Sequence, residues 1–222
     1  MGMPRQMVRV LLQEHRYRPI SGSVLLIGRQ TVPLTIEQAK ALIRDEGIAI
    51  RPEAVPQIDE RTGRGKGEVF IADASVLELM SEASVRALDI SDYEGAEIVL
   101  DLNGSIPKEL EGQFDFIYNG SCLDNIFDPA TSLKNMTTLL KPGGRIVHVE
   151  HGTRIYGPYL MYSPEWFYDY YLINGFADCK VYLGFFHPLT GAWALYNSNP
   201  YLSARQRVFW KATATSTPGT AA

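Results

Sequence analysis

The sequence predicts an α/β protein with a doubly wound, mostly parallel sheet, helices on both faces and an antiparallel last strand. Three observations predict this fold. Short β-branched apolar runs recur along the chain, helical patterns with N-cap residues lie between them, and no helical pattern separates the last two runs. The length of 222 residues suits one large domain. We therefore expect a single domain over 1–213 and a frayed tail of small and polar residues over 214–222.

The first elements are defined by apolar pattern and by breakers. A short helix is expected over 4–14, and an apolar run over 23–28 that ends in glycine predicts a buried parallel strand. Thr35 and Gln38 have the spacing of a capping box, so a helix is expected to begin there, and Gly47 is placed to end it.

The segment 51–68 differs from its surroundings. It contains three glycines, two prolines and many charges, with little periodicity. We predict a mobile loop, and a connection of this length is usually either functional or disordered.

The rest of the chain alternates strands with capped helices. Ser75 and Glu78 have capping-box spacing, and Asp128-Pro129 and Ser163-Pro164 each pair an N-cap residue with proline at the first helical position. The strands expected after the first lie at 85–90, 96–100, 114–118, 145–150, 179–185 and 205–213. The last two are expected to pair antiparallel, joined by a loop.

Composition narrows the class of protein. Hydrophobic residues are 45% and charged residues 21%, which is ordinary for a globular chain and excludes wholesale disorder. The net charge of −4 lacks the basic surplus of a nucleic-acid binder, so no nucleic-acid partner is expected. Cys122 and Cys179 are too few for a disulfide framework, and no signal-peptide core or membrane-spanning run is seen. We expect a cytoplasmic protein without a membrane partner.

The candidate site follows from the fold. Ligands of doubly wound sheets bind beyond the carboxyl ends of the strands, near the point where strand order reverses. The residues expected there are Gly28, Arg29, Gln30, Asp89, Asp101, Leu102, Asn103, Asn119, Gly120, Ser121, Glu150 and His151. Turn formation is the alternative role for Gly28, Asp89 and Asp101.

Several of these features occur together in one known family. They are the acid Asp89 closing the second strand, the turn Asp101-Leu102-Asn103, the strand Phe114–Tyr118, the string Leu139-Leu140-Lys141-Pro142-Gly143-Gly144-Arg145 and the helix within Ser163–Phe176. With them, the chain resembles the class I S-adenosylmethionine-dependent methyltransferases over about 20–185. The resemblance implies a seven-stranded sheet whose last strand is reversed.

The resemblance also implies a cofactor, S-adenosylmethionine, and roles for the strand-end residues. Gly28, Arg29 and Gln30 are expected beside the methionine part, and Asp89 is expected to accept hydrogen bonds from the ribose hydroxyls. Asp101 and Asn103 are expected beside adenine, and Asn119 and Gly120 beside the methyl group and the substrate. The implied function is O- or N-methylation of a small molecule or a glycan precursor.

The first motif departs from the family pattern. Leu26 stands where the family usually has an acid, and Gln30 and Val32 stand in place of the later glycines. Glycine lets a backbone come close to a ligand, so these side chains crowd that approach, although Arg29 can pair with a carboxylate. The alternative is a non-catalytic binding or scaffold protein of the same fold. A nicotinamide-dependent oxidoreductase is disfavoured, because G-x-G-x-x-G is lacking after the first strand.

Residues around the end of the fifth strand are candidates for catalysis. His148, Glu150 and His151 are metal-ligand types, but no further ligands cluster with them in the sequence, and no metal is expected. His151 follows the strand, and histidine is the residue type that most often moves protons in catalysis, so it is the candidate general base, with structural hydrogen bonding as the alternative.

A tyrosine-rich segment follows. Tyr156, Tyr159 and Tyr162 precede Pro164 on the loop expected to roof the pocket, and we predict that they form the substrate wall. Aromatic residues also suit a contact between two copies of the chain, so a homodimer stays open.

Overall fold

A computed structural model describes residues 2–62, 65, 67–153, 157–186, 192–198 and 209–212. The chain divides into two compact units, Met1–Leu160 and Met161–Ala222, which are described separately. The single domain over 1–213 stays a prediction, and the tail 214–222 lies outside the described residues.

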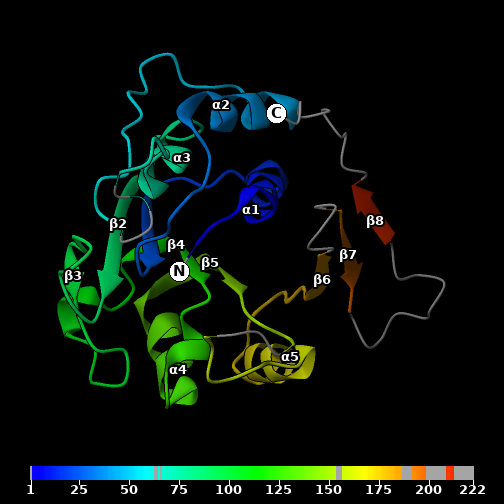
Figure 1. The fold of residues 1–222 in the computed structure, drawn as a ribbon. Coiled ribbons are helices and arrows are strands. Elements are labelled where there is room, and N and C mark those ends of the chain that lie inside the picture. The colour runs from blue at the N-terminus through cyan, green and yellow to red at the C-terminus, as the bar shows by residue number, and fades with distance from the viewer. Residues whose placement is uncertain are drawn as a thin grey trace. The chain divides into compact units, whose positions relative to one another are not determined.

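The first unit is built on a five-stranded sheet (Figure 1). Its strands are β1 (Ser23–Ile27), β2 (Ser84–Asp89), β3 (Ile98–Val99), β4 (Phe114–Gly120) and β5 (Leu140–Val149). They lie in the order β3-β2-β1-β4-β5, and every neighbouring pair is parallel. The predicted central position of the first strand is confirmed, and so is the Rossmann-like α/β fold class.

Burial explains why β1 is central. Val24, Leu25, Leu26 and Ile27 are at most 1% exposed, so both faces of this strand are covered. A strand covered on both faces needs an apolar run rather than an alternating pattern, which is what the sequence provides. Its backbone bonds to β2 on one side and to β4 on the other.

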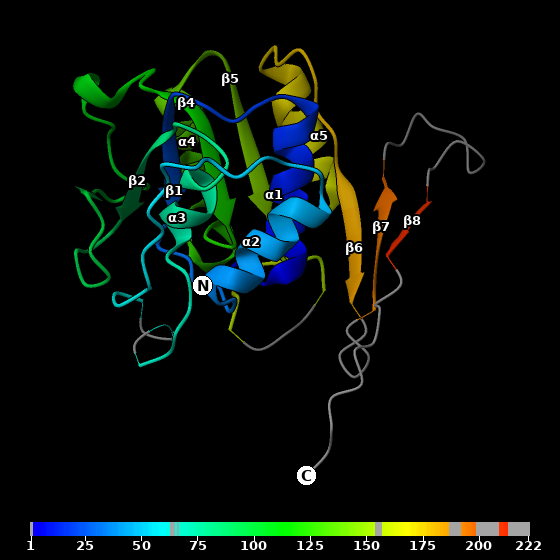
Figure 2. The same ribbon diagram turned by 90° about the horizontal axis from the view of Figure 1, so that it is seen from above.

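Helices cover both faces of this sheet (Figures 1 and 2). The helices α1 (Arg5–Tyr17), α2 (Ile36–Asp45) and α3 (Asp73–Glu78) lie on one face, and α4 (Pro129–Leu139) lies on the other. Two short 3-10 helices, η1 (Lys108–Leu110) and η2 (Leu123–Asn125), precede and follow β4. One cluster of buried residues joins α1, α2 and α3 to alternate side chains of β1 and β4.

Two of the three predicted caps in this unit are confirmed. Thr35 forms the full capping box with Gln38, and the Asp128 side chain accepts a hydrogen bond from the Thr131 backbone N–H. The Ser75 cap is wrong, because α3 begins at Asp73 and the Ser75 hydroxyl instead accepts a hydrogen bond from the Gln57 backbone N–H. A three-residue spacing alone does not distinguish a cap from a loop anchor.

The fifth strand begins earlier than predicted. The Lys141-Pro142-Gly143-Gly144 turn was expected to precede the strand, but β5 starts at Leu140 and includes it. The pairing with β4 shifts register between Phe114 and Phe116, which accommodates the turn residues as an irregularity of the strand.

The segment 51–68 makes several contacts through its described residues. Arg51 donates from its backbone N–H to the Leu79 carbonyl, and Asp59 donates to the Phe70 carbonyl. Thr62 is 3% exposed, and its hydroxyl lies 2.8 Å from that of Thr31. The mobility of this loop stays a prediction.

The second unit contains α5 (Pro164–Ile173) and a separate three-stranded sheet of β6 (Tyr182–Phe186), β7 (Trp193–Asn197) and β8 (Phe209–Ala212). The sheet has the order β6-β7-β8, with antiparallel neighbours. The predicted direct pairing of the last two runs is wrong, because β7 lies between them in a segment expected to be a loop. The seven-stranded sheet is corrected to five parallel strands and three antiparallel ones among the described residues.

No helix within the described part of the chain is long and apolar enough to cross a membrane.

Candidate functional site

The carboxyl ends of five parallel strands meet at one edge of the first unit's sheet, which we call the carboxyl edge. Each of the five strands leads into predicted site residues at this edge. Some of these residues are the last of their strand, and the others come soon after it. Where strand order reverses around β1, the ends of β1, β2 and β4 are neighbours. This is the position at which doubly wound sheets bind ligands.

The loop after β1 begins with a turn that needs glycine. Gly28 has φ of +70° and donates its N–H to the Leu88 carbonyl at 2.7 Å. A left-handed conformation is rarely adopted by residues with a side chain, so this one glycine of the family motif is retained for a geometrical reason.

Arg29 does not face solvent in this structure. Its side chain is 6% exposed and forms ion pairs with Asp73 at 3.2 Å and Glu97 at 2.5 Å. It also donates to the Gly95 carbonyl at 3.1 Å. Burial raises the pKa of the Asp73 carboxyl, and the charge of Arg29 opposes that rise. The charge of Arg29 is therefore balanced by acids of the protein itself. To pair with a ligand carboxylate, as expected from the sequence, Arg29 would have to give up these contacts.

Gln30 packs against the ends of both β1 and β4. It is fully buried, and its amide nitrogen donates to the carbonyls of Ile27 and Gly28 at 3.3 Å each. Its amide oxygen is buried and has no hydrogen-bond partner among the described residues. A Cβ added at Gly120 would lie 2.5 Å from that oxygen. The side chain that replaces a family glycine thus packs directly against the end of β4.

The N-terminal segment also covers this loop, which the sequence did not indicate. Met3 is fully buried and donates its N–H to the Thr31 carbonyl at 2.8 Å, and Gly2 forms a parallel bridge with Thr31. An apolar residue before a helix is too common a pattern to predict such a contact.

The acids at the ends of β2 and β3, Asp89 and Asp101, differ in exposure and in hydrogen bonding. Asp89 is partly exposed, and its Oδ1 accepts a hydrogen bond from the Ile90 backbone N–H at 2.7 Å. Asp101 is exposed and accepts from the Asn103 backbone N–H at 2.8 Å, which is the turn-forming alternative. The Asn103 side chain accepts from Ser132 at 3.1 Å.

A buried polar network joins the ends of β4 and β5. Asn119 is fully buried, and its amide nitrogen lies 2.8 Å from Nδ1 of His148 and 2.5 Å from Oε1 of Glu150. Burial and the charge of Asp124 raise the pKa of Glu150 to about 8, and burial lowers the pKa of His148 to about 3. At neutral pH both side chains are therefore held mainly uncharged. Asn119 is engaged in this network, and its predicted place beside the methyl group and the substrate stays a prediction.

A second cluster holds the candidate base. Nδ1 of His151 contacts Oδ2 of Asp124 and lies 2.9 Å from the Ser121 hydroxyl. Ser121 in turn donates to Asp124 at 2.6 Å. Ser121 has φ of +67°, the only positive φ at a non-glycine position among the described residues. Sequence reasoning placed Ser121 at the end of the fourth strand but did not pair it with His151, and it missed Asp124, because no motif links either residue to a histidine so far along the chain.

The predicted tyrosine wall is divided. Tyr156 lies outside the described residues. Tyr159 is 61% exposed and stacks on Phe127 with ring centroids 4.9 Å apart, while its backbone N–H donates to the Asp124 carbonyl. Tyr162 belongs to the second unit, where it packs beside Trp166 and Phe167. Within the first unit, Tyr159 is the described member of the predicted wall.

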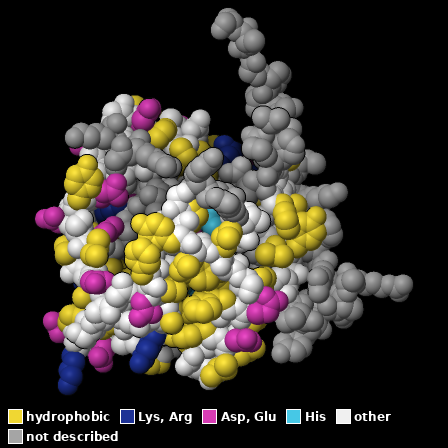
Figure 3. Space-filling view, turned by 60° about the horizontal axis from the view of Figure 1, so that its bottom comes forward, with side chains coloured by type: hydrophobic (Ala, Val, Ile, Leu, Met, Phe, Trp, Pro, Cys, Tyr) yellow, Lys and Arg dark blue, Asp and Glu magenta, His cyan; other side chains and the backbone are white. Residues whose placement is uncertain are grey.

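Catalysis by a metal ion or by a reactive thiol finds little support in the described part of the chain. No group of three histidine, cysteine, aspartate or glutamate side chains there is placed to hold a metal ion. Burial raises the pKa of Cys122 to about 12, so its thiol stays protonated at neutral pH. On the face shown in Figure 3, basic side chains are few, and apolar and acidic ones predominate.

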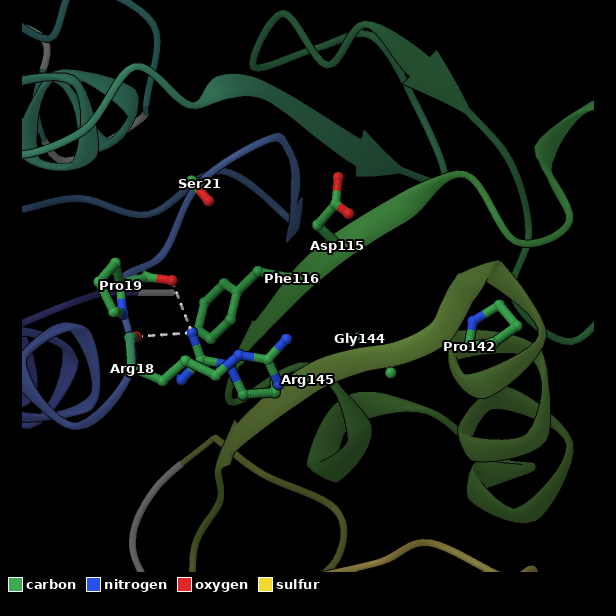
Figure 4. A pocket seen from close by; sticks show the side chains of 9 residues that line it. Arg18, Pro19, Ser21, Asp115, Phe116, Pro142, Gly144 and Arg145 are labelled. Atoms are coloured by element: carbon green, nitrogen blue, oxygen red, sulfur yellow. Dashed lines mark hydrogen bonds between the residues drawn. The ribbon is translucent and has the colours of Figure 1, made fainter.

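One cavity of about 220 Å³ lies at the opposite, amino edge of the sheet (Figure 4). Its lining includes Asp115, Phe116 and Arg145. Arg145 donates to the carbonyls of Arg18 and Pro19 at 2.7 and 3.1 Å, and it also contacts Glu14. Its guanidinium therefore serves to tie α1 to β5, and the cavity is separate from the candidate site.

The carboxyl edge fits S-adenosylmethionine in part. The partly exposed carboxylate of Asp89 suits ribose hydroxyls, and Gly28 retains the backbone turn. The buried side chains of Arg29 and Gln30 occupy the loop that is expected to receive the methionine part. Asp89 is accessible to a ribose as it stands, whereas the loop would receive a methionine part only if the buried Gln30 side chain moved.

Comparison with known proteins identifies a family. The model of the ubiE/COQ5 methyltransferase family matches residues 56–174, which is more than half of the chain. No curated protein matches the chain.

Two solved structures show weak similarity. One is assigned as an S-adenosyl-L-methionine-dependent methyltransferase of Methanococcus maripaludis, with 14% identity, a TM-score of 0.39 and coverage of 68% of this chain and 65% of that one. The other is assigned as a zinc-dependent alcohol dehydrogenase of Rhodobacter sphaeroides, with 18% identity, a TM-score of 0.36 and coverage of 87% and 61%. The chain thus spans less than two thirds of either structure, and these similarities add nothing to the family match. On the extent of that match, the chain belongs to the ubiE/COQ5 methyltransferase family.

Proposed function

We propose that the protein transfers the methyl group of S-adenosylmethionine to an oxygen or nitrogen of a small molecule or a glycan precursor. Membership of the family implies this cofactor. When bound, the cofactor supplies a sulfonium methyl group, which is an electrophile for such atoms. The protein contributes the positions of the groups around it, which is a large part of catalysis when two reactants must be aligned.

The observation that carries the proposal is the position of Asp89. Its carboxylate closes β2, next to the central strand, and it is partly exposed at the carboxyl edge. A carboxylate at this strand end is the expected acceptor for ribose hydroxyls in doubly wound sheets. His151, at the end of β5, is the proposed acceptor of a substrate proton.

Calorimetry with S-adenosylmethionine, S-adenosylhomocysteine and NAD tests this proposal. We expect both adenosyl compounds to bind and NAD not to bind. Asp89→Asn should weaken adenosyl binding and Asp89→Ala should weaken it further, by roughly 10- to 150-fold, because hydrogen bonds to a charged oxygen are lost. The exposed Asp92→Asn is the matched control and should bind as the wild type does.

A second candidate function is a non-catalytic binding protein of the methyltransferase fold. The observation in its favour is that Arg29 and Gln30 are buried and engaged with the protein itself in the loop after β1. Absence of a calorimetric signal from the wild type with either adenosyl compound at millimolar concentration would contradict methyl transfer and favour this alternative.

A further inference from the structure

The hydrogen bonds of the three described histidines in the first unit indicate which ring nitrogen carries the proton. Nδ1 of His15 accepts a hydrogen bond from the Ile20 backbone N–H at 3.2 Å. Nδ1 of His148 faces the amide nitrogen of Asn119, whose oxygen accepts from the Cys122 backbone N–H. Both rings therefore have an unprotonated Nδ1, and when neutral they carry the proton on Nε2.

His151 has the opposite arrangement. Its Nδ1 faces the carboxylate of Asp124, and an ionised carboxylate only accepts hydrogen bonds. Nδ1 must therefore be the donor, which leaves Nε2 of the neutral ring without a proton. The Ser121 hydroxyl gives its own proton to the same carboxylate, so its oxygen is free to accept from Nδ1 as well.

Asp124 is itself held firmly. Its side chain is fully buried, and Oδ1 accepts from the Asn125 amide at 2.6 Å while Oδ2 accepts from Ser121. Its backbone carbonyl accepts from the N–H groups of Tyr159 and Leu160. The His151 side chain, by contrast, is 32% exposed. A buried carboxylate thus fixes a ring that reaches the surface at the carboxyl edge.

We propose that Asp124 is the positioning residue for the proton acceptor, holding His151 so that Nε2 takes the proton from a hydroxyl of the methyl-accepting substrate. This inference rests on the proposed function, for a substrate in which a hydroxyl loses the proton. The proton moves from the substrate oxygen to Nε2, the oxygen keeps the electron pair of the broken O–H bond, and the resulting imidazolium is stabilised by the Asp124 carboxylate. The ring then returns the proton to water.

Two aromatic rings beside this cluster limit the class of substrate that fits it. Phe127 is 87% exposed and stacks on Tyr159, the residue whose backbone is bound to Asp124. An exposed pair of stacked rings favours a flat or apolar body next to the hydroxyl. The substrate class is therefore a hydroxyl compound with such a body.

Nitrogen NMR of the histidine rings tests the inference without a substrate. In two-bond proton–nitrogen spectra of the wild type at about pH 8.5, where an ordinary imidazole is neutral, His151 should carry its proton on Nδ1. His15 and His148 should carry it on Nε2, which makes them internal controls. The His151→Gln variant identifies the His151 signals among those of the four histidines, and His15→Gln and His148→Gln identify those of the two controls. A wild-type His151 with its proton on Nε2 overturns the inference, whatever any variant does.

Two variants distinguish the effect of the Asp124 carboxylate on the His151 tautomer from that of the Ser121 hydroxyl. Asp124→Asn should lower the ratio of the Nδ1–H to the Nε2–H form of His151 roughly 10- to 150-fold, because a hydrogen bond to a charged oxygen is lost. Ser121→Ala keeps the carboxylate and should leave Nδ1–H predominant. Equal effects of the two variants, or none from Asp124→Asn, would contradict the role of Asp124. Failure of cofactor binding in calorimetry is a separate result, which overturns the proposed function and leaves the tautomer measurement unaffected.

Discussion

Single side chains at the carboxyl edge carry an electrostatic cost that the fold offsets with hydrogen bonds. Asn119 and Asp124 are fully buried, and each has at least two hydrogen-bond partners. Glu150 is held in the same network by the Asn119 amide and the Leu123 backbone N–H. Buried polar groups are tolerated when they are paired in this way. The network does not fully offset the cost of a negative charge on Glu150, because burial and then the nearby charge of Asp124 raise its pKa.

The first prediction concerns the pH dependence of stability through Glu150. Burial raises the pKa of Glu150 from 4.5 to about 8, so the folded protein binds this proton more tightly than the unfolded chain does. The stabilisation is fully present below about pH 4.5 and is lost as the pH rises through about 8. We therefore expect the free energy of unfolding in urea to fall between about pH 5 and about pH 8.

Glu150→Gln removes the titration while keeping a neutral side chain of the same shape. The variant should lose this part of the pH dependence, whereas Glu109→Gln, at an exposed position of η1, should keep it. If the wild type and Glu150→Gln changed in parallel over the whole range, the raised pKa of Glu150 would be contradicted.

At the scale of elements, the loop after β1 and the end of β4 are fitted to each other. Gln30 stands beside Gly120, where a side chain as small as alanine would meet Gln30 Oε1 at 2.5 Å and Tyr118 at 2.8 Å. The absence of a side chain at 120 is therefore what allows the glutamine at 30 to pack against the end of β4.

The second prediction tests this fit. Gly120→Ala should lower the free energy of unfolding by about 1–3 kcal/mol, because it overpacks a closed site. In the double variant with Gln30→Ala, part of that loss should be recovered, since the nearest atom is removed. Urea unfolding of the wild type, both single variants and the double variant gives the coupling between them. Strict additivity of the two changes would count against direct contact.

The elements that the sequence predicted are those whose local pattern agrees with their surroundings. The run Val24–Ile27 is apolar because both faces are covered, and Thr35 and Asp128 cap their helices through neighbours in sequence. β7 was missed because turn-forming residues surround Trp193–Asn197 on both sides. Patterns of this kind are read locally, and a short strand among turn formers gives a weak one.

The site was predictable by position and less so by contact. Parallel strands place their following residues at one edge, so Gly28, Asp89 and His151 were found from the strand ends alone. The contact between Asp124 and His151 depends on the neighbouring ends of β4 and β5, which only the three-dimensional fold brings together. The lost glycines were visible in the sequence, but the packing of Gln30 against Gly120 was not.

Over the whole molecule, the family match and the altered loop after β1 fall in different parts of the chain. The match covers 56–174, which includes the strands β2 to β5, the cluster around His151 and α5. It does not include the first 55 residues, which contain α1, β1, α2 and the loop with Arg29 and Gln30. The part of the chain that departs from the glycine motif is thus outside the part that matches the family, and the proposed cofactor site draws on both parts.

The last prediction uses the stability of the whole chain as the readout of that dependence. A ligand that binds only the folded state at 100 times its Kd stabilises it by about 2.7 kcal/mol, which raises the melting temperature of a chain of this size by roughly 5–10 °C. We expect S-adenosylhomocysteine and adenosine both to stabilise the wild type. Gln30→Gly should tighten S-adenosylhomocysteine binding about tenfold, adding roughly 3–6 °C at the same ligand concentration, because the space for the methionine part is opened. Adenosine lacks that part, so its effect should be the same in the wild type and in Gln30→Gly, while Asp89→Ala should reduce the effect of both ligands. An equal gain for adenosine, or no gain for S-adenosylhomocysteine, would show that the Gln30 side chain does not limit how the methionine half is received.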